Sequence, residues 1–246
     1  MSPAEFQTLV EAESRLWWFR GMQKILFRIL DPIAPAGATV LEAGCGTGYF
    51  ARILERRYGW RMFPVDLAAE ALAHARRAGA GRLTQANIAR LPFPADSFDV
   101  LVSLDVLVYF HRGGDSAALD EFARVLKPKG LLVIRVAALD ILYSAHSRFT
   151  GERQRFTRRG LMRTVENSGF RVLRCTYANS LLLPLALARF RVWEPLLRKP
   201  PASGTALVPQ WMDRILYLPL AAESGWLGLG ANLPIGQSLL LLAEKT

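Results

Sequence analysis

The stretch that decides the fold is LEAGCGTGYF, residues 41–50. An apolar strand pattern leads into it and a helical pattern begins inside it at Tyr49, so its glycines lie at a turn from a strand to a helix. Gly44, Gly46 and Gly48 let the backbone turn tightly and come close to a ligand. In an open α/β sheet, the first such turn is a position where nucleotide-like ligands bind. The stretch therefore predicts a ligand-binding loop.

The rest of the chain alternates short apolar strand patterns with helical patterns. We expect strands at residues 38–44, 60–66, 82–86, 98–104, 131–137, 170–178 and 237–245, and helices at residues 3–30, 49–58, 68–78, 116–126 and 157–169. This alternation predicts a seven-stranded, doubly wound, mostly parallel α/β sheet with right-handed crossovers. An insertion, residues 179–235, precedes the last strand; a Pro-, Gly- and Ser-rich linker at 199–209 splits it into two apolar helical stretches.

Composition excludes a disordered chain and shows that the excess charge is local. The chain has 246 residues, 51% of them apolar, and its 31 Lys and Arg against 21 Asp and Glu give a formal net charge of +10. Twelve basic and only three acidic residues lie between Arg148 and Lys199, whereas residues 1–147 hold 17 basic and 15 acidic residues. The charge therefore concerns one stretch and not the whole chain.

Cysteine use and hydropathy bear on localisation. Cys45 and Cys175 lie too far apart in sequence for the disulfide framework of a small secreted domain, which indicates a reducing compartment. The polar N-terminal stretch lacks the apolar core of a secretory signal, and no apolar run is long enough to predict a membrane-spanning helix. We expect a cytoplasmic protein, with membrane association as an alternative.

Two acidic positions narrow the ligand of the glycine loop. The spacing is GxGxG and not the GxGxxG of dinucleotide sites, and Glu42 stands two residues before the first glycine. A carboxylate there would repel a pyrophosphate and attract an ammonium or sulfonium group. Asp66 closes the second strand, where an acid accepts both hydroxyls of a ribose. The pattern favours a cationic adenosine ligand without phosphate.

On these motifs the sequence resembles the class I S-adenosylmethionine-dependent methyltransferases, of the type 11-like group, over residues 41–173. The segments LPFPADSFDVLVSLDVL (91–107) and FARVLKPKGLLVI (122–134) are similar to the family's fourth and fifth strands and their approaches. The resemblance implies a Rossmann-like methyltransferase sheet of strand order 3-2-1-4-5-7-6, S-adenosylmethionine as the cofactor, and S-adenosylhomocysteine as the product.

The resemblance also implies roles for particular residues. Glu42, Gly44 and Gly46 would surround the methionine part of the cofactor. Asp66 would bind the ribose, and Leu67 would lie against the adenine. The remaining cofactor residues would be Asn87, as acceptor from the adenine amino group in place of the usual Asp; Ile88, covering the ring; and Leu104, offering its carbonyl to the methionine ammonium.

A narrower resemblance, to a subgroup of bacterial methyltransferases, covers most of the chain. It rests on WWFRG (17–21), YSAHSRFTGERQRFT (143–157), TYANSLLLPLA (176–186) and LPIGQSLLLLAEK (233–245). That subgroup often carries a His-Asp-His pattern, whose last two places here hold Ser147 and Glu152, which puts a role built on the pattern in doubt. The implied domains are an N-terminal helical cap (1–36), the cofactor-binding core (37–178), the helical insertion as a substrate cap or membrane-surface element (179–235), and the last core strand (236–246).

Four further residues are candidates near the reaction. Arg20 is a candidate for the cofactor carboxylate, with a solvated helix face as the equal alternative. Tyr109 and His111 follow the fourth strand, and His146 follows the fifth; these three are the catalytic candidates, because they lie after the carboxyl ends of strands and a neutral imidazole accepts a proton. No Cys/His spacing predicts a metal site.

The basic stretch allows a solvated face, an anionic substrate, or an anionic surface that binds the apolar helices of the insertion. Nucleic acid is disfavoured, because the fourth strand ends in SLDV and lacks the turn with which amino-methylating enzymes stack a flipped base. We therefore expect methyl transfer to an oxygen or nitrogen of a small or lipid-linked, anionic acceptor. The alternatives are an RNA methyltransferase and a non-catalytic protein that binds S-adenosylmethionine or lipid.

Overall fold

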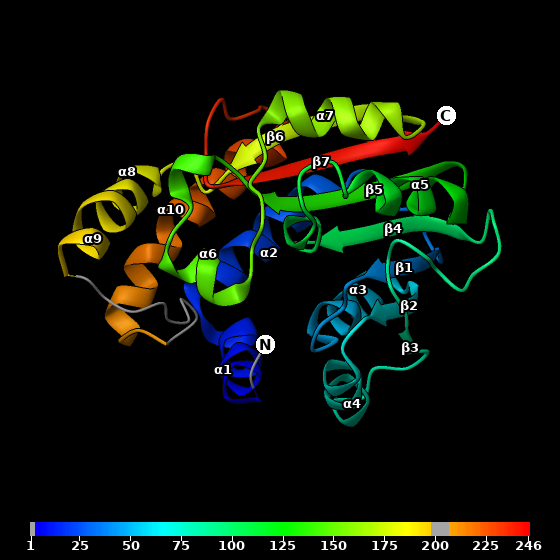
Figure 1. Ribbon diagram of the computed structural model, residues 1–246, viewed down its shortest axis with the longest axis horizontal. Helices are drawn as coiled ribbons and strands as arrows, with labels where there is room; N and C mark the ends of the chain where they lie inside the picture. The colour runs from blue at the N-terminus through cyan, green and yellow to red at the C-terminus, as the bar shows by residue number, and fades with distance from the viewer. Residues whose placement is uncertain (1–2, 198–206) are drawn as a thin grey trace. The chain divides into compact units, whose positions relative to one another are not determined.

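The computed structural model describes residues 3–197 and 207–246, which form a seven-stranded sheet with helices around it (Figure 1). The strands are β1 (Thr39–Ala43), β2 (Arg61–Asp66), β3 (Thr84–Gln85), β4 (Phe98–Leu104), β5 (Leu126–Ala137), β6 (Phe170–Ala178) and β7 (Ser238–Lys245). Their order is β3-β2-β1-β4-β5-β7-β6, so the predicted fold class and strand order are confirmed.

The helices alternate with these strands in the first two thirds of the chain. The α-helices are α1 (Pro3–Arg15), α2 (Trp17–Leu30), α3 (Tyr49–Tyr58), α4 (Ala69–Arg77), α5 (Ser116–Val125), α6 (Ala145–Thr150), α7 (Arg158–Asn167), α8 (Leu183–Leu187), α9 (Glu194–Leu197) and α10 (Gln210–Gly228). Short 3₁₀ helices lie at η1 (Leu107–Tyr109) and η2 (Asp140–Leu142), and a π-helix, η3 (Ala188–Trp193), joins α8 to α9. Most of the predicted linker, at 198–206, lies outside the described residues.

Strand pairing places the carboxyl ends of β1, β2 and β4 at one edge of the sheet. β1 pairs in parallel with β2 and with β4, and β5 pairs in parallel with β4. The β7 arrow runs in the opposite direction to β4 and β5 in Figure 1. The loops that follow β1, β2 and β4, which carry most of the predicted site, therefore start from the same edge.

The predicted helix 3–30 is divided at Leu16 into α1 and α2, and the predicted start of the fifth strand is wrong. We expected helix 116–126 to be followed by a turn at Pro128 and Gly130, with the next strand starting at residue 131. Instead α5 ends at Val125 and β5 begins at Leu126, which pairs with Phe98 before a register shift. The strand accommodates Pro128 and Gly130 because the register shift lies at these residues, so they need not join the regular hydrogen bonding between the strands.

The chain divides into two compact units. Unit 1 is drawn from residues 1–33, 137–157 and 176–239, and unit 2 from residues 34–136, 158–175 and 240–246. Unit 2 thus contains β1 to β4 with α3, α4, α5 and α7, and unit 1 contains the N-terminal helices and the insertion. The predicted division into cap, core and insertion remains a prediction.

Within unit 1, α2 and α10 lie side by side in parallel. A Cβ on Gly21 would come within 2.3 Å of Leu220, so the two backbones approach closely at that point. Asp213 of α10 accepts a hydrogen bond from the first backbone N–H of α2, at Trp17 (2.6 Å), and forms an ion pair with Arg20. An acidic side chain at a helix N-terminus is favourable, so α10 both packs on α2 and caps it.

The other helices of the insertion join unit 1 through a separate apolar cluster. Leu183 and Ala186 of α8 pack with Leu142 of η2, and Phe190 of η3 covers them. No helix in the described part of the chain is long and apolar enough to cross a membrane.

Candidate active site

The glycine loop after β1 combines close packing with open space. Gly44, Gly46 and Gly48 all have positive φ, at 89°, 52° and 69°, which favours glycine. A Cβ on Gly44 would lie 2.2 Å from Val106, and one on Gly48 would lie 2.8 Å from Ala75. A Cβ on Gly46 would meet no atom within 4 Å. Two glycines are thus required by the protein's own packing, whereas Gly46 borders free space.

Asp66, the last residue of β2, is bonded to this loop. Its Oδ2 accepts the N–H of Gly46 at 2.8 Å and its Oδ1 accepts the N–H of Ala68 at 2.9 Å. Each carboxylate oxygen retains further acceptor capacity. The next residue, Leu67, is 66% exposed. The structure therefore brings together a fixed carboxylate, a glycine turn and an exposed apolar side chain.

Glu42 lies in β1, one residue before its end, and is only 3% exposed. A carboxylate with so little water around it interacts strongly with any cation that comes near. The structure thus places a buried acid next to the glycine turn, as the sequence predicts.

Asn87 and Ile88 follow β3. Asn87 is exposed, and its Oδ1 accepts the N–H of Ala89 at 2.9 Å, which closes a local turn. Ile88 is 6% exposed and belongs to the core. Their predicted contacts with adenine remain predictions, and Asn87 would have to share its amide oxygen with this turn.

A charged network fixes the segment that follows Asn87. Glu121 of α5 accepts the N–H of Leu91 at 2.7 Å and pairs with Arg124, which also donates to the carbonyls of Leu91 and Phe93. The hydrogen bond from Arg124 lowers the pKa of Glu121. The LPFP segment is therefore attached to α5 by side chains.

The loop after β4 starts with an ion pair. Asp105, just past Leu104, has φ of 59°, and its carboxylate accepts hydrogen bonds from Arg135 of β5 at 3.0 Å and 2.6 Å. The residue at the start of η1 is Val106, which makes no side-chain cap. Because the Arg135 side chain is 8% exposed, the pair anchors the start of this loop.

Tyr109 and His111 lie on the loop that this pair anchors. Tyr109, at the end of η1, is 40% exposed, and His111 is also exposed. Gly114 donates its N–H to the His111 carbonyl at 2.8 Å, which gives the loop a tight turn. Both side chains are accessible to a substrate from solvent.

Arg20 and His146 belong to unit 1. Arg20 pairs with Asp213, and its guanidinium lies 4.8 Å from the centre of the Tyr217 ring. His146 lies on α6, half-buried, and its carbonyl accepts a hydrogen bond from Thr150. Their predicted roles toward cofactor and substrate remain predictions.

The two departures from the His-Asp-His pattern share one partner. Arg155 donates to the hydroxyl of Ser147 at 3.0 Å and to the carboxylate of Glu152 at 3.1 Å, and also to the carbonyl of Ala138. Ser147 is fully buried and the Arg155 side chain is 9% exposed. At these two positions the structure has a buried structural network.

Comparisons with known proteins agree with this geometry. Residues 41–134 match the family model described as a methyltransferase domain. Over 129 residues, 52% of this chain and 45% of the relative, the sequence is 36% identical to a probable S-adenosylmethionine-dependent methyltransferase of Mycobacterium tuberculosis. It is 36% identical over 121 residues to a malonyl-[acyl-carrier protein] O-methyltransferase of Yersinia pestis, covering 48% of this chain and 44% of that one. The matches thus span less than half the length of these relatives.

A solved structure extends the likeness to the whole fold. A methyltransferase of Thermotoga maritima, described as a possible histamine N-methyltransferase, matches with a TM-score of 0.63 and 15% identity over 99% of this chain and 96% of that one. Residues 41–134 therefore match a methyltransferase domain, and the fold around them is that of a solved methyltransferase. The family's cofactor is S-adenosylmethionine, as the glycine loop and Asp66 had indicated.

Arg135, which anchors the loop after β4, was not predicted from the sequence. Arg135 interrupts the apolar strand LLVIRVA, and a charge in the middle of a buried strand requires a partner. The sequence shows this charge but not its partner, because Asp105 lies 30 residues earlier, just past the end of β4.

The two cysteines lie in buried positions. Cys45 and Cys175 form no disulfide, and burial raises the pKa of the Cys175 thiol to about 11. Among residues 3–197 and 207–246, no group of His, Cys, Asp or Glu side chains gathers where it could hold a metal ion.

Proposed function

We propose that the protein transfers a methyl group from S-adenosylmethionine to an oxygen or nitrogen of a small or lipid-linked, anionic acceptor. The observation that carries this proposal is the Asp66 carboxylate, bonded to the N–H of Gly46 in a glycine turn that has free space beside it. The turn lies inside the methyltransferase domain.

The residues present fit the cofactor. Asp66 supplies acceptors for ribose hydroxyls, Leu67 an exposed apolar surface for adenine, and Glu42 a negative charge near the cationic end. When bound, S-adenosylmethionine would supply an activated methyl group: the acceptor's lone pair would bond to the methyl carbon while the carbon–sulfur bond breaks and S-adenosylhomocysteine leaves. In this proposal the chain's residues align the two reactants and exclude water.

A proton must leave a hydroxyl or amine acceptor. Tyr109 and His111 are the proposed groups, because they are exposed on the loop that the Asp105–Arg135 pair anchors. A neutral imidazole takes up such a proton, and general bases of this kind contribute roughly a hundredfold to ten-thousandfold in rate. His146 is the alternative base.

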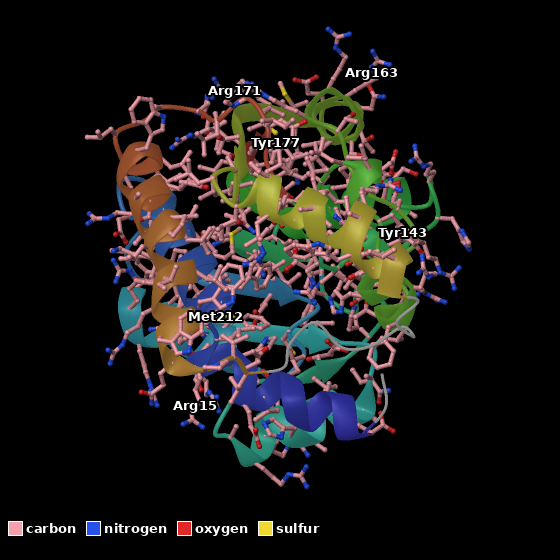
Figure 2. The ribbon with its side chains drawn as sticks, turned by 90° about the vertical axis from the view of Figure 1, so that its left-hand side faces the viewer. Arg15, Tyr143, Arg163, Arg171, Tyr177 and Met212 are labelled. Atoms are coloured by element: carbon pink, nitrogen blue, oxygen red, sulfur yellow. The ribbon has the colours of Figure 1, made fainter. Side chains whose placement is uncertain are left out.

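We propose an anionic acceptor because the chain exposes arginines, which attract negative charge. Arg159 and Arg163 lie exposed on α7, and Figure 2 shows Arg163 extending outward from the helix. The similarity to an O-methyltransferase that acts on malonyl-[acyl-carrier protein] supports an oxygen acceptor and an acidic substrate. Guanidinium groups bind carboxylates and phosphates in a bidentate manner.

Cofactor binding is the first test. Isothermal titration with S-adenosylmethionine and S-adenosylhomocysteine should show binding of both, and Asp66→Ala should weaken it roughly tenfold to hundredfold through the loss of charge-assisted hydrogen bonds. Asp120→Ala, an exposed acid on α5, is the matched control and should bind as wild type does. Absence of binding by wild type would overturn the proposal.

Methyl transfer identifies the acceptor class. With the methyl group of S-adenosylmethionine radiolabelled, label should enter lipid or small-acid fractions of a cell extract and not RNA. His111→Gln should lower kcat and leave cofactor affinity unchanged. Label in RNA would favour the RNA methyltransferase, and cofactor binding with no label in any fraction would favour the non-catalytic binding protein.

A further inference from the structure

The outer side of α10 carries an uninterrupted apolar stripe. Its large side chains are Trp211 (63% exposed), Ile215 (56%), Leu218 (65%), Trp226 (57%) and, just past the helix, Leu229 (86%). Ala222, at the helical spacing between Leu218 and Trp226, is also exposed. These positions recur at intervals of three or four residues, so they form one face of the helix.

The opposite side of α10 is already used. Leu220 and Leu227 are fully buried, and Gly21 of α2 lies against Leu220. One apolar side of a helix is enough to pack it on its own protein. A second apolar side, exposed to water, favours contact with another apolar surface. At 19 residues, α10 is about 28 Å long, so its outer stripe is a contiguous apolar patch and not a single exposed leucine.

The helices before the linker repeat the pattern. Leu181, Leu185, Val192, Trp193 and Leu196 are between 45% and 75% exposed along α8, η3 and α9. In both views α8, η3, α9 and α10 lie on the same side of unit 1, which Figure 2 turns toward the viewer, with Met212 marking α10. The two segments are joined where Glu223 of α10 accepts the N–H of Leu181 at 2.7 Å.

Acidic and basic side chains on these segments differ in exposure. The acids point inward: the Asp213 and Glu194 side chains are 16% and 17% exposed, and Glu223 is 2% exposed. Arg189, with a side chain 59% exposed, lies 3.9 Å from Glu194, and Arg191 donates to the Ile141 carbonyl at 2.6 Å. Arg191 and Arg214 are also exposed. Among the described residues of α8, η3, α9 and α10, the exposed charged side chains are therefore all cationic.

We propose that α8, η3, α9 and α10 bind the surface of an anionic phospholipid bilayer, with the two apolar stripes entering the headgroup boundary. Exposed tryptophan and leucine beside arginine is the composition of helices that lie in this boundary, where apolar burial and attraction to acidic headgroups add together. A second copy of the chain fits less well, because self-complementary pairing would oppose Arg189, Arg191 and Arg214 with their own copies.

Vesicle sedimentation with the full chain tests the proposal. The probes are vesicles of phosphatidylcholine alone and of phosphatidylcholine with about one third phosphatidylglycerol. Wild type should sediment with the anionic vesicles at least tenfold more strongly than with the neutral ones. Trp211→Gln combined with Leu218→Gln should lower the partition coefficient at least tenfold, and Arg189→Gln combined with Arg214→Gln should remove the preference for anionic lipid.

Controls separate binding from misfolding and from catalysis. Leu173→Gln changes an exposed leucine of β6, 45% exposed, and should bind vesicles as wild type does. Thermal unfolding should show that all variants remain folded. Because the readout is binding, vesicle association stands or falls independently of methyl transfer.

Three results would overturn the proposal. One is no association of wild type with anionic vesicles. Another is a stripe variant, Trp211→Gln with Leu218→Gln, that binds as strongly as wild type. The third is sedimentation velocity that shows a dimer abolished by the stripe variant while vesicle binding is absent, because the occupant of the face would then be a second copy of this chain.

Discussion

In unit 2, Glu42 and Asp66 lie at the glycine loop, where a cationic ligand would reach them, whereas the acids of helices α9 and α10 in unit 1 are bonded to the protein itself. Asp66 holds Gly46 and keeps acceptor capacity for a ligand. Asp213 caps α2, and Glu223 accepts the N–H of Leu181.

In the proposed function Glu42 and Asp66 serve recognition, whereas other acids in both units, such as Glu121 and Asp213, hold segments of the protein together. The net charge of +10 conceals this difference. The twelve basic residues of 148–199 are also divided, since residues 148–157 and 176–199 belong to unit 1 and residues 158–175 to unit 2. What looks like one basic stretch in the sequence is shared by two units.

The largest expected effects separate two glycines of one loop. Gly44→Ala would force a Cβ against Val106 at 2.2 Å in a left-handed backbone, so it should lower the free energy of unfolding by about 2 to 4 kcal/mol. Gly46→Val also strains a backbone with φ of 52°, but its Cβ meets no atom within 4 Å, so without a clash it should cost less stability, and it should reduce S-adenosylmethionine affinity roughly hundredfold.

Urea unfolding and isothermal titration measure both quantities on both variants. Equal losses of stability, with cofactor affinity unchanged in Gly46→Val, would show that the space beside Gly46 is not the ligand site.

Next in size is the buried acid of unit 1. Glu223→Leu removes the acceptor of a part-buried hydrogen bond from the N–H of Leu181, so stability should fall by about 1 kcal/mol. Glu223→Gln keeps an acceptor oxygen and should lose less. Denaturant unfolding of the two variants provides the comparison, and cofactor affinity should stay at the wild-type value in both.

The two units should also differ in the sign of their pH dependence. Burial, opposed by hydrogen bonds from backbone N–H groups, raises the pKa of Glu223, so its contribution is greatest below the unfolded value near 4.5 and falls as pH rises. The Arg124 hydrogen bond lowers the pKa of Glu121, so its contribution is present above that value and is lost as pH falls.

Unfolding free energies from about pH 4 to pH 7 test these signs. Glu223→Gln should make stability rise more steeply with pH than in wild type, and Glu121→Gln should make it rise less steeply. Slopes that change in the same direction in both variants would contradict the contrast.

The smallest expected effect concerns Arg20 and Asp213. Because the Arg20 side chain is 38% exposed, a double-mutant cycle of Arg20→Met and Asp213→Asn should give a coupling of about 1 kcal/mol or less. Titration of Arg20→Met with S-adenosylmethionine decides its other predicted role: unchanged affinity removes Arg20 from the cofactor residues, and weaker affinity with unchanged stability keeps it there.

Most of the fold follows from local patterns. The strands β4 and β6 and the helix α3 have the predicted bounds, because apolar alternation and a glycine stop specify them within a few residues of sequence. The start of β5 was wrong, because Pro128 and Gly130 indicate a turn and only pairing with β4 overrides them.

The site was partly readable for the same reason. The positions of Glu42, Gly44, Gly46 and Asp66 at one edge of the sheet were predictable, because the sequence pattern marks strand ends; their contacts with the cofactor remain predictions. The Asp105–Arg135 pair and the bond from Trp17 to Asp213 were not, because each joins residues that only the folded sheet or helix pair brings together.

The cap that Asp213 places on α2 has a consequence for the order of folding. The first turn of α2 and its packing partner are separated by 196 residues of sequence, so α2 leaves the ribosome long before α10 exists. Contacts of such long range close late and slow folding. During synthesis the side of α2 that packs against Leu220 therefore stays exposed until α10 has been made.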